Sequence, residues 1–371
     1  MILILINSDI GKKGNIGFRT GKVIENLHKK KIDFFAISRG NKLVNNKNII
    51  TMGLLGTLSL FINFLRIYFF PKLDASSINN KIYEYFVIFV CTFLDKKKIK
   101  IIYTGIYSKK LTNYFKNFNI KTIIDVSMAP YKIGEKQMNG KIPKNQKENE
   151  IITILNSYKL IAPSEFVQNC ILKIYKKKSK VINFASSNFY KKNFRFLKNK
   201  KQIKFCFVGL VNERKGINYL LKVWADNPIF KKHQLILCGR VFKNQKNLIN
   251  KVDADNIVLT GFTDPTKIFK NADIFVFPSL MEGSAKAVFE AMGHSLPVIT
   301  TKEAGSIVDN KKNGIIIKAK NYDELKKAMK FFILNKNYIK KFGKNAYNKS
   351  KQYTWKNYSD KVVNVLINEQ I

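Results

Sequence analysis

The chain has 371 residues, and 67 lysines and arginines against 25 aspartates and glutamates give it a formal net charge of +42. This length is enough for two domains that each bury an apolar core, and the four cysteines are too far apart in sequence for a zinc site or a redox pair. The charge predicts attraction to polyanions, but the lysines are spread over the whole length and form no recognised nucleic-acid-binding motif.

Short apolar runs alternate with helical segments in the first half of the chain. The expected elements are strands at residues 2–6, 33–37, 100–103, 121–125 and 159–162 and a helix at about 20–30. This alternation is typical of a parallel sheet covered by helices, so residues 1–190 are predicted to form a Rossmann-like domain. The polar residues 137–150 predict a loop. The opening run MILILI is too short for a signal peptide, so we expect a cytoplasmic protein.

Residues 51–70 are almost entirely apolar, which is unusual in this alternating pattern. Seven large apolar residues share one face at helical spacing: Leu54, Leu55, Leu58, Phe61, Ile62, Leu65 and Phe69. Three interpretations are open: a buried or lid helix, an interfacial helix that contacts a membrane, and a membrane span. The span is disfavoured because it would disrupt the sheet and because Asn63 and Arg66 are costly in lipid.

Apolar strands begin again after residue 201, with KFCFVGL, QLILCG, NIVLTGF, DIFVFPS, PVITT and GIIIK. They predict a second doubly wound sheet, so the expected fold is α/β with Rossmann-like domains at residues 1–190 and 200–350. The basic stretch 188–201 has no clear period and is the predicted linker. The last segment has helical spacing at Trp355, Tyr358, Val362 and Leu366.

Residues 272–301, ADIFVFPSLMEGSAKAVFEAMGHSLPVITT, are the most informative stretch of the sequence. They predict a buried strand, a turn, and a helix that begins near Ser284 as its N-cap. A helix N-terminus at the carboxyl end of a parallel strand suits a diphosphate. Gly283, Ser284 and Ala285 are small enough for a phosphate to approach the backbone closely.

Two glutamates flank this predicted phosphate site. Glu290 lies within the helix, and its side chain leans back toward the N-terminus, so its carboxylate is expected to accept hydrogen bonds from ribose hydroxyls. Glu282, in the turn, is expected to orient a sugar and to stabilise positive charge at the anomeric carbon. The alternative is a solvated Glu290 and a Glu282 that caps the turn. The mostly apolar helix around Glu290 favours the functional interpretation.

A basic cluster lies in a second strand-to-helix turn, FCFVGLVNERKGINYLL. Arg214, Lys215 and Gly216 come just before the predicted helix. Two cations at this place would neutralise a diphosphate leaving group. In so basic a chain the alternative is a pair of solvated side chains, which the position at a turn with Gly216 disfavours.

Together these motifs resemble glycosyltransferase family 4, the group 1 transferases of the GT-B fold. The two glutamates of that family, separated by seven residues, correspond to Glu282 and Glu290, and its phosphate-binding lysine to Lys215. The resemblance covers about residues 203–330. It implies two Rossmann-like domains that face each other across a cleft, with the donor on the C-terminal one and the acceptor on the N-terminal one. It also implies that the helix at residues 353–371 packs back on the N-terminal domain.

The resemblance further implies a retaining transfer of a hexose from a nucleotide-sugar, without metal or cofactor. The leaving diphosphate itself would help to deprotonate the acceptor. Because members of the family often build cell-envelope polysaccharides, the expected acceptor is a glycan or a lipid-linked sugar, and peripheral contact with an anionic membrane at its inner face is expected. Gly14 and Gly17, in residues 11–21, resemble the family's glycine-rich turn that faces the phosphates and the acceptor; a plain surface loop is the alternative.

The sequence departs from the family pattern at three places. Leu210 stands where many relatives have an arginine, for which Arg214 is the candidate substitute, and Ser295 stands where a glycine is usual. Residues 125–131, DVSMAPY, lack the histidine that relatives often place near the donor sugar.

Two other functions remain compatible with the sequence. A polyanion- or nucleic-acid-binding protein would explain the charge and would show salt-dependent affinity for DNA. A nucleotide-sugar epimerase on the same fold would need no acceptor. The family resemblance favours the transferase over both, and no nucleic-acid partner is expected. Asp253 and Asp255 precede a predicted strand and are interpreted as a solvated loop, so no metal site is expected.

Overall fold

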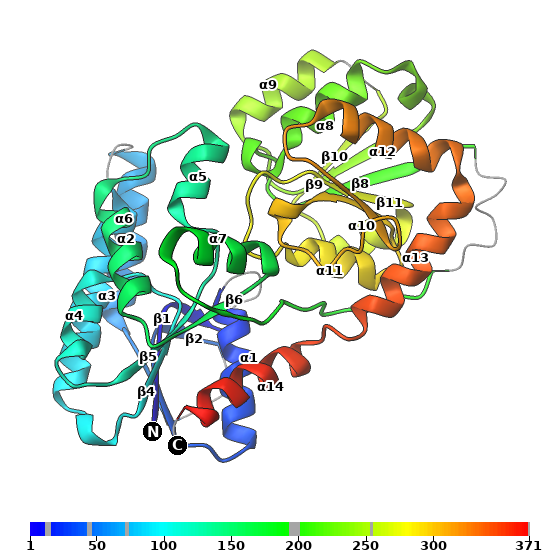
Figure 1. Cartoon of the computed structure of the whole chain (residues 1–371). Helices are drawn as coiled ribbons and strands as arrows, with labels where there is room; N and C mark the ends of the chain where they lie inside the picture. The colour runs from blue at the N-terminus through cyan, green and yellow to red at the C-terminus, as the bar shows by residue number, and fades with distance from the viewer. Residues whose placement is uncertain (12–15, 43–46, 71–73, 193–200, 253–254, 370–371) are drawn as a thin grey trace.

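The computed structural model describes residues 1–11, 16–42, 47–70, 74–192, 201–252 and 255–369. These residues form two parallel sheets, each covered by helices, that lie side by side in Figure 1. The predicted class, α/β with two doubly wound sheets, is confirmed. Gly14, Asp253 and most of the predicted linker lie outside the described residues.

The first sheet has seven parallel strands in the order β3-β2-β1-β4-β5-β6-β7. They are β1 (Ile2–Ile10), β2 (Phe34–Asn41), β3 (Ile49–Thr51), β4 (Ile101–Thr104), β5 (Lys121–Asp125), β6 (Lys159–Ala162) and β7 (Lys180–Val181). The bounds predicted for β5 and β6 match. The two edge strands, β3 and β7, are too short to give a periodic signal in the sequence.

Strand β1 shows why the chain begins with an unbroken apolar run. Ile2, Ile4 and Ile6 pack on one side of the sheet, and Leu3 and Leu5 pack in a separate cluster on the other side. A strand covered on both faces cannot show the alternation of apolar and polar residues that marks a half-buried strand.

The helices around the first sheet are α1 (Ile16–Lys29), α2 (Leu54–Tyr68), α3 (Ala75–Thr92), α4 (Lys109–Lys116), α5 (Tyr131–Met138), α6 (Lys144–Asn156) and α7 (Glu165–Tyr175), with the short 3-10 helix η1 (Lys96–Lys98). The loop predicted at residues 137–150 is wrong, because α6 begins at Lys144. The first turns of α6 are polar and give no apolar period in the sequence, although Glu150, Thr153 and Ile154 of this helix are buried.

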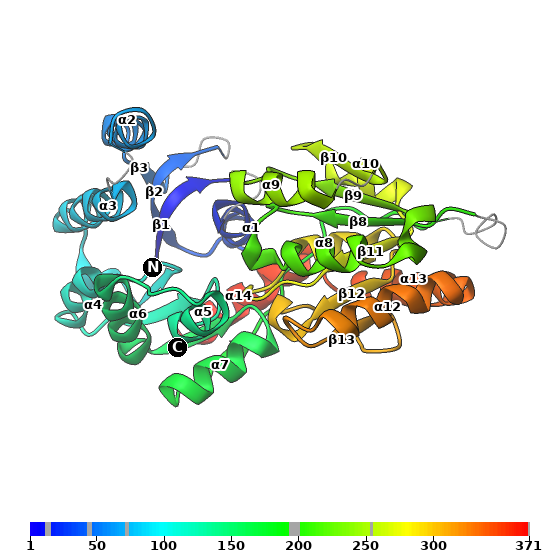
Figure 2. The same ribbon diagram turned by 90° about the horizontal axis from the view of Figure 1, so that it is seen from above.

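Helix α2 occupies most of the apolar segment 51–70, but most of the large side chains that the structure describes there are not buried; Ile62 is the exception. Leu54 is 86% exposed, and Leu58, Phe61 and Phe69 are exposed as well, so the buried interpretation is wrong. No described residue of α2 lines the cavity of this domain, so α2 is not a lid over it. Figure 2 shows α2 at the outside of the domain, beside α3. Within the described parts of the chain, no helix is long and apolar enough to cross a membrane.

The second sheet has six parallel strands in the order β10-β9-β8-β11-β12-β13. They are β8 (Lys204–Val208), β9 (Gln234–Cys238), β10 (Ile257–Gly261), β11 (Ile274–Phe277), β12 (Val298–Thr301) and β13 (Gly314–Ile317). Its helices are α8 (Ile217–Ala225), α9 (Lys243–Val252), α10 (Pro265–Asn271), α11 (Lys286–Gly293), α12 (Tyr322–Leu334) and α13 (Lys336–Ser350), with the 3-10 helices η2 (Glu213–Lys215), η3 (Pro228–Lys232) and η4 (Lys302–Ala304). One continuous apolar core unites these elements.

The last helix, α14 (Trp355–Asn368), packs against α1 of the first sheet. Val362 and Leu366 share a core cluster with Leu27 of α1. The segment before α14 runs beside the segment that leaves β7, since the amide of Ser186 donates to the carbonyl of Tyr353 over 3.0 Å. The chain therefore passes from the first domain to the second after β7 and returns before α14, and these two connections lie side by side.

Ser295, the residue that stands in place of a usual glycine, adopts the left-handed conformation with φ of 61°. Its buried Oγ accepts from the amide of Lys192 and donates to the carbonyl of Tyr190, both over 3.1 Å. We expect Ser295→Ala to lower the free energy of unfolding by about 1–3 kcal/mol, because both partners lose a hydrogen bond. Ser295→Gly should be about 1 kcal/mol more stable than the alanine variant, because glycine adopts positive φ without strain. Urea unfolding measures both; an alanine variant as stable as the wild type would contradict the expectation.

Candidate functional site

The site in the second domain is built where β8 and β11 end. Helix η2 follows β8, and a turn at residues 278–285 follows β11. The two are joined because the carbonyl of Arg214 accepts from the amide of Leu280 over 2.8 Å and from Oγ of Ser279 over 3.1 Å. Both predicted clusters, the basic one and the acidic one, therefore meet at the same edge of the sheet.

Gly216 allows the close contact between η2 and the turn at residues 278–285. Its φ is 74°, and a Cβ on it would lie 1.9 Å from the carbonyl oxygen of Pro278. Any larger residue would force η2 away from the turn. The glycine in the RKG motif is thus required by close backbone approach as well as by its conformation.

Three predicted site residues form one charged cluster. Oε1 of Glu282 lies 2.7 Å from Nη1 of Arg214 and also contacts Nζ of Lys215. Nη1 of Arg214 donates to the carbonyl of Met281 as well, over 2.9 Å. Burial lowers the pKa of Lys215, and the charge of Arg214 adds to this effect, while Glu282 opposes it. The carboxylate of Glu282 is thus held between the two cations.

The small residues of the turn lie where the sequence predicts them, but the cap of the helix differs. Helix α11 begins at Lys286, and its N-cap is Ala285, with no capping side chain, so the prediction of Ser284 as N-cap is wrong. The amide of Ala285 instead donates to the carbonyl of Ala304 in η4, over 3.0 Å, which displaces the helix start by one residue.

The side chain of Ser284 therefore does not cap helix α11. Its Oγ is buried, and among the described residues it has no hydrogen-bond partner. An unsatisfied buried hydroxyl is costly, so each one calls for an explanation. Beside it, the first amides of α11 have no partner within the helix. Both features suit an oxygen-rich anion.

Glu290 lies in the second turn of α11. Its Oε1 is 2.8 Å from Nζ of Lys286, and the side chain is 17% exposed. The Nζ of Lys286 lies 5.7 Å from the centre of the ring of Phe18, in α1 of the other domain. Lys286 is thus a third cation beside the site that the sequence reasoning missed, although its spacing of four residues from Glu290 is a recognisable pairing signal.

The turn also contacts the first domain directly. A Cβ on Gly283 would lie 2.0 Å from the carbonyl oxygen of Ser127, in the segment after β5, and Oγ of Ser164, after β6, donates to the carbonyl of Gly283 over 2.6 Å. Met281 packs into an apolar cluster of the first domain. The segment DVSMAPY therefore supplies a backbone contact where relatives have a histidine. Sequence reasoning missed Ser127, since a backbone contact leaves no side-chain signal.

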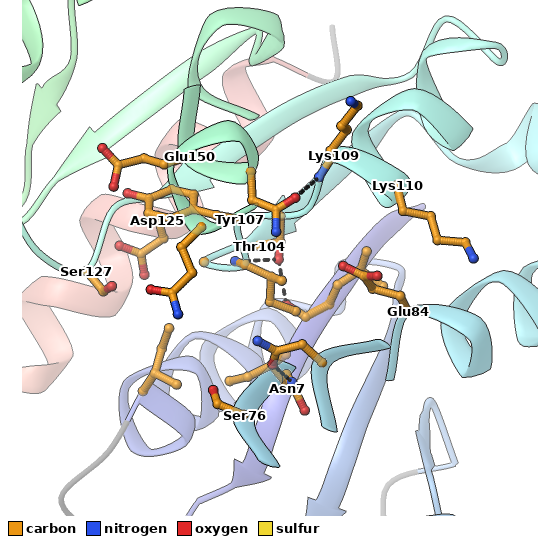
Figure 3. Close-up of a pocket in the computed structure, with 18 of the residues that line it drawn as sticks. Asn7, Ser76, Glu84, Thr104, Tyr107, Lys109, Lys110, Asp125, Ser127 and Glu150 are labelled. Atoms are coloured by element: carbon orange, nitrogen blue, oxygen red, sulfur yellow. Dashed lines mark hydrogen bonds between the residues drawn. The ribbon is translucent and has the colours of Figure 1, made fainter. Parts of the chain in front are cut away.

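A cavity of about 870 Å³ opens in the first domain at the carboxyl ends of β4 and β5 and beside the middle of β1 (Figure 3). Ser127 also lines it, so the cavity extends to the place where Gly283 meets the first domain. Its lining is rich in amides, hydroxyls and charged groups, among them Asn7, Asn80, Glu84, Thr104, Lys109 and Asn149. Such side chains recognise polyhydroxylated molecules through many hydrogen bonds.

Two buried acids stand at the wall of this cavity. Oδ2 of Asp125 accepts from the hydroxyl of Tyr103 over 2.8 Å and lies 3.2 Å from the guanidinium of Arg19. Glu150 accepts from the hydroxyl of Tyr175 over 2.5 Å, and burial raises the pKa of Glu150. Their partners hold both carboxylates in fixed positions.

Gly17, a candidate for a loop that faces phosphate, lies in α1. Its carbonyl accepts from the amide of Gly11 over 2.9 Å. Gly17 does not line the cavity, although its neighbours Ile16 and Thr20 do.

Comparison with known proteins agrees with the geometry of the second domain. Residues 188–349 match the family described as glycosyl transferases group 1. The chain is 29% identical, over 206 residues, to an uncharacterized glycosyltransferase of Methanocaldococcus jannaschii, which covers 54% of this chain and 56% of that protein. The chain therefore spans about half the length of this relative.

Two solved structures extend the similarity of fold to the whole chain. WaaG, a glycosyltransferase involved in lipopolysaccharide biosynthesis, superposes with a TM-score of 0.72 at 13% identity and covers 98% of this chain and 99% of its own. Alr3699/HepE of Anabaena, solved with UDP and glucose, superposes with a TM-score of 0.69 at 14% identity and covers 99% and 100%. The predicted GT-B fold is confirmed.

Proposed function

We propose, from the match of residues 188–349 to the family described as glycosyl transferases group 1, that this chain is a glycosyltransferase that uses a nucleotide-sugar donor. The donor would bind at the turn of residues 278–285 in the second domain, and a hexose would pass with retention of configuration to an acceptor in the cavity of the first domain. The product would belong to a cell-surface polysaccharide. Peripheral contact with an anionic membrane, at its inner face, is part of the proposal.

One observation carries the proposal for the donor: cations and an unpartnered buried hydroxyl converge at the start of α11. Arg214 and Lys215 stand on one side of the turn, and Oγ of Ser284 lies in it. A nucleoside diphosphate would supply the oxygens that Ser284 and the first amides of α11 lack. Glu282 would keep both cations in place before the donor binds, which avoids reorganisation during the reaction.

We propose that side-chain cations replace a metal ion in this site. When the bond between sugar and phosphate breaks, negative charge grows on the leaving diphosphate, and Lys215 and Arg214 are positioned to stabilise it. The half-buried position of Lys215 strengthens this interaction, because the effective dielectric constant is lower there than in bulk water. Transfer is therefore expected to continue in excess EDTA.

The acceptor is proposed to be a glycan or a lipid-linked sugar. The amides, hydroxyls and carboxylates of the cavity favour a ligand with many hydroxyls, and the contact of Ser127 with Gly283 puts one end of the cavity beside the donor turn. An acceptor hydroxyl bound at that end of the cavity would then lie close to the donor sugar.

A thermodynamic cycle that combines one variant with one modified ligand tests the proposed contact between Glu290 and ribose. Uridine, guanosine and adenosine diphosphates and their 2′,3′-dideoxy analogues would be titrated calorimetrically into the wild type and Glu290→Ala. We expect the variant to bind the preferred diphosphate about 10–100-fold more weakly, because hydrogen bonds to a charged group are lost.

The dideoxy analogue is the control for this prediction. It should bind the wild type and Glu290→Ala with about equal affinity, because it has no hydroxyls for the carboxylate to accept. An equal loss of affinity for both nucleotides would mean that Glu290 acts through the structure of α11, and the ribose contact would be rejected.

A further inference from the structure

The outer surface of α2 and α3 carries large apolar side chains in solvent. We define the α2–α3 surface by six of them, whose exposed fractions run from 54% to 86%: Leu54, Phe61, Phe69, Tyr85, Phe89 and Phe93. On α3 the rings of Phe89 and Phe93 lie 5.2 Å apart, and on α2 the ring of Phe64 lies 6.5 Å from that of Phe61 and 6.0 Å from that of Phe69, so each helix carries a row of adjoining apolar side chains. Contiguous apolar surface of this kind marks a site of interaction, whereas single exposed apolar residues do not.

The two helices pack together, with α2 outermost and remote from the second domain (Figure 2). Ile62 is buried on the inner side of α2, whereas Leu54 and Phe61 point outward into solvent. Among the side chains of α2 that the structure describes, Ile62 is the only buried one.

Cations flank this surface. Arg66 lies on α2 and is exposed, and Lys96, Lys97 and Lys98 follow Phe93 in the chain. Nζ of Lys110 lies 3.1 Å from the centre of the ring of Tyr85. An apolar face bordered by basic residues is the pattern that binds anionic lipid headgroups and their acyl boundary together. A second copy of a chain with a net charge of +42 would instead be repelled.

Helix α3 joins this surface to the cavity of the first domain. Ser76, Asn80 and Glu84 line the cavity, and Tyr85 and Phe89 belong to the α2–α3 surface. Lys110 belongs to both, since it lines the cavity and covers the ring of Tyr85. A molecule anchored in a bilayer under this surface would thus have its headgroup within a helix width of the cavity.

We propose that the α2–α3 surface docks on an anionic lipid bilayer and thereby presents a lipid-anchored acceptor to the cavity of the first domain. The docking names the surface for the membrane contact that the proposed function includes, and the presentation of an acceptor rests on that same function. The apolar side chains enter the boundary between headgroups and acyl chains, and the flanking cations pair with the lipid phosphates.

Co-sedimentation of the full-length protein with vesicles tests this docking. One set of vesicles contains phosphatidylglycerol and phosphatidylcholine in equal amounts, and the other contains phosphatidylcholine alone. The wild type should sediment with the anionic set. Joint replacement Phe61→Asp and Phe89→Asp should weaken this binding about tenfold or more, because two apolar anchors are lost. Phe262→Asp, which alters a side chain 96% exposed in the second domain, should leave it unchanged.

Thermal stabilisation by uridine, guanosine or adenosine diphosphate, measured on the same proteins, separates the two proposals. A double variant that keeps nucleotide stabilisation but loses the vesicles supports the docking and reports an intact fold. Docking is overturned if the wild type does not sediment with anionic vesicles, or if Phe262→Asp weakens binding as much as the double variant. It is also overturned if sedimentation velocity shows a wild-type dimer that the double variant abolishes.

Discussion

Lys215→Ala is expected to lower the rate of sugar transfer by about 10²–10³-fold, the loss typical when one group that stabilises developing charge is removed. Lys215 is half-buried, and its ammonium group contacts Glu282 beside Arg214. Without it, the leaving diphosphate would lose one of two cations, and the remaining pair of Arg214 and Glu282 would carry no net charge. The readout is the release of nucleoside diphosphate from UDP-, GDP- and ADP-hexoses, which reports transfer to any acceptor, water included.

Lys344→Ala is the matched control for this variant. Lys344 is exposed on α13 of the same domain, so its replacement changes the net charge equally without touching the turn. Rates that fall alike in both variants would mean that overall charge governs the reaction. An unchanged rate in Lys215→Ala would contradict the role assigned to this residue.

Gly283→Ala is expected to reduce transfer by about 10²-fold or more while each domain stays folded, because small displacements of reacting groups carry such losses. A methyl group at this position would lie 2.0 Å from the carbonyl oxygen of Ser127. The two domains would have to separate, and the hydrogen bond from Ser164 to Gly283 would break. Transfer rates and thermal unfolding, measured together, separate the loss of alignment from the loss of fold.

Gly140→Ala is the control here, because a Cβ on Gly140 would meet no atom closer than 3.8 Å. This variant should transfer sugar like the wild type. If Gly283→Ala also keeps the wild-type rate, the close contact between the turn and the segment after β5 is not needed for the reaction.

The strands buried on both faces were the easiest part of the fold to predict. Residues 2–6 of β1, 205–208 of β8 and 274–277 of β11 are apolar without interruption, as strand segments under two layers of helices must be. Helix α6 was missed because lysine, asparagine and glutamine fill its first turns, and its packing depends on Glu150, a buried acid. The exposure of α2 could not be predicted, because an apolar helical face is the same pattern whether protein or solvent lies against it.

For the site, local motifs predicted which residues follow β8 and β11 but not how they pair. The two turns are separated by over sixty residues in sequence, so the contact of Glu282 with Lys215 and Arg214 is set by the order of strands in the sheet. The N-cap shifted from Ser284 to Ala285 because the turn bonds to η4, a long-range contact. The contacts of Ser127 and Ser164 with Gly283 depend on the meeting of two domains, which no single motif encodes.

Thermal unfolding in the presence of UDP, GDP and ADP and their hexose conjugates tests the proposed donor site most directly, with a DNA duplex as the competing polyanion. A ligand that binds only the folded protein raises its stability in proportion to the logarithm of ligand concentration over Kd. We expect nucleotides of one base to raise the Tm of the wild type, and this rise to be lost in Lys215→Ala. If no nucleotide raises the Tm and the duplex does, the chain is a polyanion-binding protein and not a nucleotide-sugar transferase.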